Sequence, residues 1–174
     1  MEHAGDVRAV ATCQAPCHSG SPPGGAEAAA WGPVRTFVAT GEAAAGAPPA
    51  VHVWGVGADG SAPAQATWTL RGFHAHGVGL LAFAPPRFEP APPPPPPGSR
   101  ATAAGELVLR LFSVGLDPRC MVCGDMVAVH DLRLGSEPSY RLVCSGEAAS
   151  KRPLFVAGDP WVPDHFVTGG KEHL

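Results

Sequence analysis

Apolar residues occur in short runs rich in Val, Leu and Phe, and turn-forming residues separate these runs. The clearest case is Leu107–Leu134, where two runs flank a turn carrying Gly115 and Asp117, and the second run ends in His130-Asp131. Apolar runs of this length between Gly, Pro and Asp residues are typical of two strands joined as a hairpin. The pattern therefore predicts an antiparallel strand pair.

The same pattern recurs along the chain, once at residues 35–54 and again from residue 164 to 170. Successive strands joined by short polar turns form an antiparallel meander, and a recurring meander indicates a repeat architecture. We expect strands at 7–12, 36–40, 51–54, 67–71, 80–84, from 107 onwards, and at 126–131, 140–144, 154–157 and 166–170.

The glycine and proline content bears on the segments that connect the predicted strands. With 22 Gly and 21 Pro among 174 residues, a core of long helices is not expected. A Ser-, Pro- and Gly-rich stretch at 16–31 is interpreted as an insertion, and the Pro-rich stretch 85–105 as a disordered loop. Within it, Pro92–Pro97 predicts exposed polyproline II, which would act as a spacer or as a weak ligand for an aromatic groove.

The net charge of −3 does not predict binding to nucleic acid or to an anionic membrane. No apolar run reaches the roughly 20 residues needed to cross a bilayer, and the first residues lack the basic and apolar regions of a signal peptide. We therefore expect a cytoplasmic protein. Its five cysteines are an odd number, which favours free thiols.

A His-containing turn, a strand, a strand ending near Ser/Thr-Gly, an Asp turn and a strand ending in Trp-Asp together resemble a WD repeat. More narrowly, Phe37–Glu42 and Val51–Trp54 resemble the echinoderm microtubule-associated protein-like family, as do Leu111–Asp117 and Phe166–His173. The resemblance implies an all-β fold, a partial WD-repeat β-propeller. It would have about two to three four-stranded antiparallel blades with long Pro/Gly-rich insertions.

The resemblance also divides the chain. Residues 1–84 would form a first repeat with its insertion at 16–31, and residues 106–174 a second repeat and the start of a third. The Pro-rich loop 85–105 would separate them. Because propellers close with about 4–8 blades, we expect the chain to be part of a longer protein.

In typical WD blades a turn His, a strand Ser/Thr, a turn Asp and the strand Trp form a buried hydrogen-bonded network. The resemblance assigns these structural positions to His3, Thr40 and Trp54 in the first repeat, and to His74 or His76, Ser113, Asp117, His130 and Asp131 in the second. The Trp-Asp pair is Trp54-Gly55 in one copy and His130-Asp131 in the other, so we expect partial networks. These are architectural positions, and we nominate no catalytic residue.

The resemblance implies a non-catalytic protein-interaction scaffold that binds tubulin or microtubules and lies on the cytoskeleton or in a cilium. Family members can carry an N-terminal coiled coil and a hydrophobic segment, and this sequence contains neither pattern. A general WD-repeat adaptor unrelated to tubulin is therefore the alternative.

Two motifs suggest other chemistry. The turn Gly55–Gly60 matches Gly-x-Gly-x-x-Gly, but the residues after it predict a strand, whereas a phosphate site needs a helix N-terminus. Cys120 and Cys123 have the spacing of a zinc pair, but zinc takes four ligands. We expect no cofactor and no metal; a cofactor or zinc module is the less favoured alternative. The further donors available on paper are Cys13, Cys17, His18 and Cys144.

Overall fold

In the computed structural model, the described part of the chain forms eleven β-strands and no helix, and so contains no helix able to cross a membrane. The structure describes residues 6–15, 35–43, 48–57, 60, 65–89, 106–116, 126–134, 137–147 and 153–170. The strands are β1 (Val7–Ala15), β2 (Arg35–Glu42), β3 (Ala50–Val56), β4 (Trp68–Arg71), β5 (Val78–Phe83), β6 (Arg87–Glu89), β7 (Glu106–Gly115), β8 (Met126–Leu134), β9 (Ser139–Glu147), β10 (Pro153–Gly158) and β11 (Phe166–Gly170). The predicted all-β class is confirmed.

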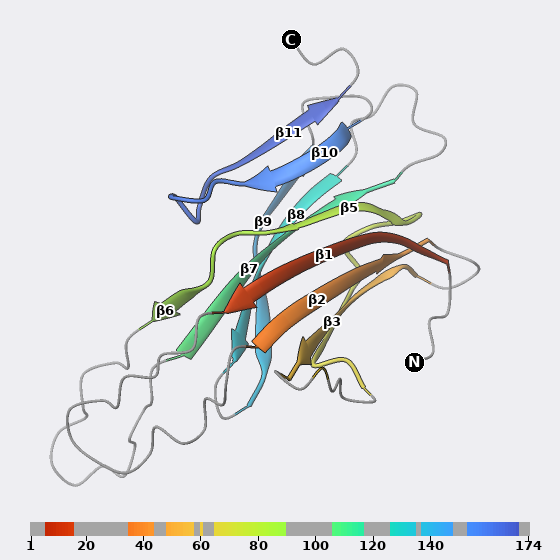
Figure 1. Ribbon diagram of the computed structural model, residues 1–174. Helices are drawn as coiled ribbons and strands as arrows, with labels where there is room; N and C mark the ends of the chain where they lie inside the picture. The colour runs from red at the N-terminus through yellow and green to blue at the C-terminus, as the bar shows by residue number, and fades with distance from the viewer. Residues whose placement is uncertain are drawn as a thin grey trace, which may run out of the picture.

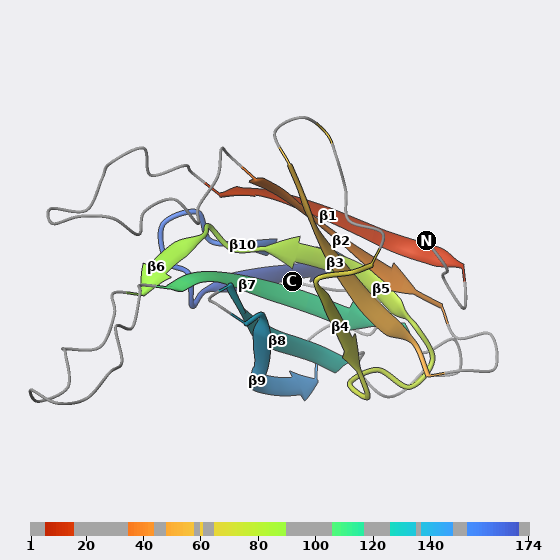
Figure 2. The same ribbon diagram turned by 90° about the horizontal axis from the view of Figure 1, so that it is seen from below.

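The strands form three antiparallel sheets, shown from two sides in Figures 1 and 2. The first sheet has the order β1-β2-β3-β4 and the second has the order β5-β7-β8-β9, with β6 also paired to β7. The third contains β10 and β11. The first strand of each sheet contacts the first strand of the next sheet: β1 contacts β5, and β5 contacts β10.

The three sheets repeat one register. In each, the first strand carries a bulge opposite the end of the second strand: between Val7 and Ala9 in β1, Val78 and Leu80 in β5, and Pro153 and Phe155 in β10. One step further along, Thr40, Ser113 and Thr168 occupy the same place on the second strand. A bulge re-aims the strand at a defined point. The shared bulge therefore lets positions in the three sheets be compared directly.

The main core lies between the first and second sheets. It combines Phe37, Val53 and Trp68 from the first sheet with Leu109 and other leucines of the second, all buried. Burying each such side chain stabilises the fold by about 1.5–3 kcal/mol. The sheets approach closely at Gly41, where an added Cβ would lie 2.6 Å from Cγ1 of Val78. The backbone itself is thus part of this interface.

A smaller core joins the second sheet to the third. Ala84, Phe112 and Val129 are buried there against Val156 of β10. The ring of Phe112 lies 4.8 Å from that of Phe166 on β11, centroid to centroid. Strand β7 is buried on both faces because it lies in the middle of the second sheet, with another sheet on either side.

Two sequence expectations differ from the structure. β6 lies inside the stretch 85–105, which we expected to be a disordered loop throughout; its pairing with β7 orders residues 87–89. β5 pairs with β7, so the first and second sheets separate between residues 71 and 78, ahead of the boundary expected at residue 84. The insertion 16–31 and Pro92–Pro97 lie outside the described residues.

Candidate interaction surface and buried polar clusters

A buried hydrogen bond joins two positions that the sequence had assigned to one network. His74 lies in the turn before β5, and its Nε2 is 2.8 Å from Oγ of Ser113 on β7. The Ser113 hydroxyl donates to the carbonyl of Ala128 at 3.4 Å, so Nε2–H of His74 is the donor to Ser113. Burial lowers the pKa of His74 to about 4, which keeps the ring neutral at neutral pH.

His130 lies beside this pair on β8 and occupies the place that Trp54 has on β3, as the strand registers show. It is 1% exposed, and its ring packs edge-on against Phe73 at a centroid distance of 4.3 Å. Burial, and to a lesser degree the repulsion that a protonated His74 would exert, lower its pKa to about 4 against the opposing effect of Asp131. Neither ring nitrogen bonds to another described residue. This histidine therefore acts mainly as a neutral packing group.

The other predicted repeat positions are dispersed. His76 is exposed, whereas Trp54 is buried in β3. Thr40 is equivalent to Ser113, and its buried hydroxyl has no hydrogen-bond partner among the described residues. His3 and Asp117 lie outside the described residues. The structure thus brings together His74, Ser113 and His130, all from the part of the chain that we expected to form the second repeat.

A second buried polar chain, in the first sheet, was missed by the sequence reasoning. His52 on β3 has its Nε2 3.2 Å from Oε1 of Glu42 and its Nδ1 3.2 Å from Oγ1 of Thr69. A hydroxyl, an imidazole and a carboxylate in a row invite comparison with a nucleophile, a base and its orienting acid. Thr69, however, pairs with His52 in the strand ladder, and an acyl-transfer site also needs donors free to bind an oxyanion. The contacts among Glu42, His52 and Thr69 instead hold β2, β3 and β4 together.

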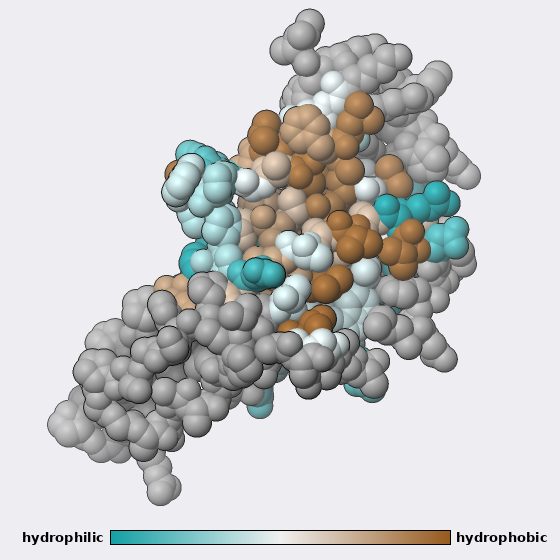
Figure 3. All heavy atoms as spheres, viewed as in Figure 1, coloured by the Kyte–Doolittle hydropathy of each residue, from teal (hydrophilic) through white to brown (hydrophobic). Residues whose placement is uncertain are grey.

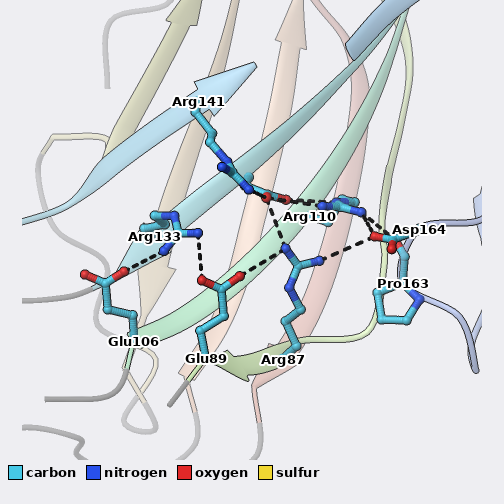
Figure 4. A network of polar contacts seen from close by, with 9 residues as sticks. Arg87, Glu89, Glu106, Arg110, Arg133, Arg141, Pro163 and Asp164 are labelled. Carbon is cyan, nitrogen blue, oxygen red and sulfur yellow. Dashed lines mark hydrogen bonds and ion pairs between the residues drawn. The ribbon is translucent and has the colours of Figure 1, made fainter. Parts of the chain in front are cut away.

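The largest polar cluster surrounds Asp131, which is fully buried on β8 (Figure 4). Arg110 binds it through two bonds, from Nε to Oδ1 at 2.8 Å and from Nη2 to Oδ2 at 3.2 Å. Arg87 and Arg141 donate to Oδ2 at 3.0 and 3.1 Å. Burial raises the pKa of Asp131, but the bonds from Arg110 and Arg141 and the nearby positive charges outweigh it, so the pKa is lowered.

The cluster continues outward as alternating charges. Arg110 also binds Asp164, in the turn before β11. Arg133 binds Glu89 at 2.7 Å and Glu106 at 2.8 Å. The described cluster contains four arginines and four carboxylates: Arg87, Arg110, Arg133, Arg141, Glu89, Glu106, Asp131 and Asp164. Because these charges balance, the cluster offers no net charge for an anion or cation. It connects the strands β6, β7, β8 and β9 to the third sheet.

Exposed apolar side chains gather on the third sheet. Phe155 on β10 and Val167 on β11 are 50% and 55% exposed, and Trp161 in the connecting turn is 87% exposed. Figure 3 shows apolar side chains over β10 and β11 and onward toward β1, where Val10 is also exposed. A contiguous exposed apolar surface of this kind marks a site of protein association.

Next to this surface is a hollow of about 330 Å³, between β8 and β9 of the second sheet and the open side of β11. We call it the β11 hollow. Its walls are formed by Val127, Val129, Cys144, Ser145, Gly146, Glu147, Phe166 and Thr168. The walls are mostly apolar, with Glu147 as the one charged residue among them. The hollow is therefore suited to an apolar side chain.

The remaining motifs gain no support as cofactor or metal sites. Gly55 lies inside β3, and the next described element after Gly60 is strand β4. The described residues contain no group of three or more side chains placed to hold a metal. Cys13 is partly buried, and burial raises the pKa of its thiol to about 11. Cys17, His18, Cys120 and Cys123 lie outside the described residues.

No protein-family model matches the chain, and no solved structure matches it.

Proposed function

We propose that the chain is part of a WD-repeat β-propeller and serves as a non-catalytic protein-interaction scaffold. The observation that carries this proposal is the bulge found at the same register point in all three sheets, together with their face-to-face packing. Radial repetition of four-stranded antiparallel sheets is the design of a propeller. The His74–Ser113 bond also fits the network implied by the resemblance.

The chemistry of the described surfaces favours binding over catalysis. The charged cluster around Asp131 is balanced, and the three buried histidines His52, His74 and His130 lie inside or between sheets. Large apolar side chains such as Trp161 and Phe155, in contrast, face solvent. Rigid aromatic and aliphatic side chains of this kind contribute most to protein interfaces.

The proposed partner, by the resemblance, is a microtubule, and the proposed location is accordingly the cytoskeleton or a cilium. The test is co-sedimentation of the purified chain with polymerised tubulin at about micromolar concentration. We expect pelleting that weakens in Trp161→Ser and persists in Tyr140→Ser, a control at an exposed aromatic residue on β9 of the second sheet. Absence of pelleting would refute tubulin binding and leave the general adaptor.

A further inference from the structure

The first strand of the second sheet is interrupted, whereas the first strand of the first sheet is continuous. β1 pairs with β2 without a break from Ala9 to Ala15. In the second sheet β5 pairs with β7 as far as Phe83, and the separate strand β6 pairs with residues 106–108 of β7. Both strands lie on the edge of β7 that faces away from β8 (Figure 2). β6 is therefore a short, separate cover for one end of this edge.

Two consecutive prolines separate β6 from β5. Just before them, the N–H of Ala84 donates to the carbonyl of Arg110 on β7 at 2.9 Å. Pro85 and Pro86 follow, and neither has an N–H that could continue the ladder. β6 is thus joined to β5 through two residues that donate no hydrogen bond to β7, so it can leave the sheet while β5 stays paired.

The pairing of β6 places two carboxylates directly opposite each other. Glu89 is the cross-strand partner of Glu106, and like charges in this arrangement are destabilising. Arg133 on β8 compensates, since its Nη2 lies 2.7 Å from Oε2 of Glu89 and its Nη1 lies 2.8 Å from Oε2 of Glu106 (Figure 4). The three side chains are 24–42% exposed, so dissolved ions can screen this contact.

A second charged contact holds the other end of β6. Arg87 donates to Oδ2 of the buried Asp131 at 3.0 Å, and its Nη1 lies 3.8 Å from Oδ1 of Asp164 in the turn before β11. Phe88, between the two charged residues of β6, is 39% exposed and so contributes only part of the stabilisation of a fully buried side chain. Charged contacts and the short ladder with β7 therefore hold β6 in place.

We propose that β6 is a detachable strap and that Arg133 clamps it by bridging Glu89 and Glu106. When the strap is docked, β7 is paired on this edge at residues 106–108. When it is released, the same residues present backbone N–H and C=O groups to solvent. Release also withdraws the arginine of β6 from the buried carboxylate and from the turn before β11. The device belongs to the second sheet and does not depend on the proposed scaffold function.

The test is hydrogen exchange of the full chain, read by mass spectrometry on peptides that cover 87–89 and 106–108. Arg133→Gln removes the bridging charge and leaves the two carboxylates facing each other, so we expect exchange in both segments to become at least about tenfold faster. Exchange in β5, on the other side of the prolines, should stay within about twofold of the parent.

Arg141→Gln is the matched control. It makes the same substitution in the same charged cluster, but the described contact of Arg141 is to Asp131 and not to β6. We therefore expect exchange in 87–89 to stay within about twofold of the parent.

A double variant separates the clamp from a loss of packing. Arg133→Gln combined with Glu106→Gln removes the repulsion together with the bridge, so exchange in 87–89 should return to within about threefold of the parent. In the parent, raising the salt concentration from about 0.05 M to about 0.5 M should speed exchange in 87–89, and the double variant should respond less.

Four results would each overturn the inference. Two concern the single variants: unchanged exchange in 87–89 for Arg133→Gln, or an equal increase for Arg141→Gln. Faster exchange throughout β7 and β8 in Arg133→Gln would show loss of the whole sheet instead of release of the strap. A double variant that exchanges as fast as Arg133→Gln would assign the effect to lost packing of the arginine side chain.

Discussion

Replacing Asp131 by Asn gives the most direct test of how this fold is held together. The carboxylate is fully buried and accepts hydrogen bonds from Arg110, Arg87 and Arg141. Asn keeps nearly the same shape but removes the negative charge. Among the described residues Arg110, itself almost fully buried, then keeps only Asp164 as an acidic partner.

The expected loss follows from this burial. Removing one partner of a buried ion pair costs about 3–5 kcal/mol, because the other charge stays out of water without compensation. The free energy of unfolding of a domain is only about 5–15 kcal/mol, so the effect will be large. Arg141→Ala removes a contact to the same carboxylate, but its side chain is 60% exposed, and we expect a loss of about 0–1 kcal/mol.

The assay is urea unfolding followed by far-UV circular dichroism, with both variants compared with the parent chain. Arg110→Leu combined with Asp131→Leu removes both charges and should recover much of the loss, since no buried charge then stands alone. A loss below about 1 kcal/mol for Asp131→Asn, or a double variant less stable than the single one, would show that the cluster does not behave as a buried ion pair.

Three further predictions concern the contacts between and within the sheets. The pKa values of His74 and His130 are lowered to about 4, so the stability that these two neutral histidines contribute is complete above about pH 6.5 and is lost as the pH falls toward 4. The loss in the free energy of unfolding is on the order of 3 kcal/mol for each histidine. An unchanged urea midpoint between about pH 7 and about pH 4.5 would contradict this. Gly115→Ala, whose added Cβ would lie 2.8 Å from Nδ1 of His74, should destabilise by about 1–3 kcal/mol, whereas Gly146→Ala, with open space around it, is the control and should not show the same loss. Trp68→Phe keeps the apolar packing but loses the hydrogen bond to β9, and thermal unfolding should report a loss of about 1 kcal/mol; a stability equal to that of the parent would mean that this bond contributes nothing.

Strand content was predictable because each strand carries its own signal. Short apolar runs such as Val51–Trp54 and Phe166–Gly170, bounded by Gly, Pro and Asp, indicated strands that the structure contains. Strand ends were less predictable: β1 continues to Ala15, past the expected end at 12. β6 was missed because three residues carry no pattern, and its order comes from pairing with β7 and from the bond of Arg87 to Asp131.

Of the buried polar clusters, too, some could be predicted from the sequence and others could not. His74 and Ser113 were found because both occupy repeated positions along the chain. The Glu42–His52–Thr69 chain and the arginine cluster were not found, because their members are joined only when neighbouring strands pair or sheets stack. Burial also decided the state of the histidines, since the lowered pKa of His130 arises chiefly from desolvation inside the fold.

By itself, the order of apolar runs and turn residues determined that this protein consists of antiparallel strands, because the apolar run that forms a strand and the turn residues that end it are both local signals. Only the tertiary structure decided which faces are covered. The equivalent positions Trp68 and Cys144 show the difference, since one is buried by the next sheet and the other lines a hollow. Which face is covered depends on sheet stacking, a contact between segments far apart in the chain that no local pattern encodes.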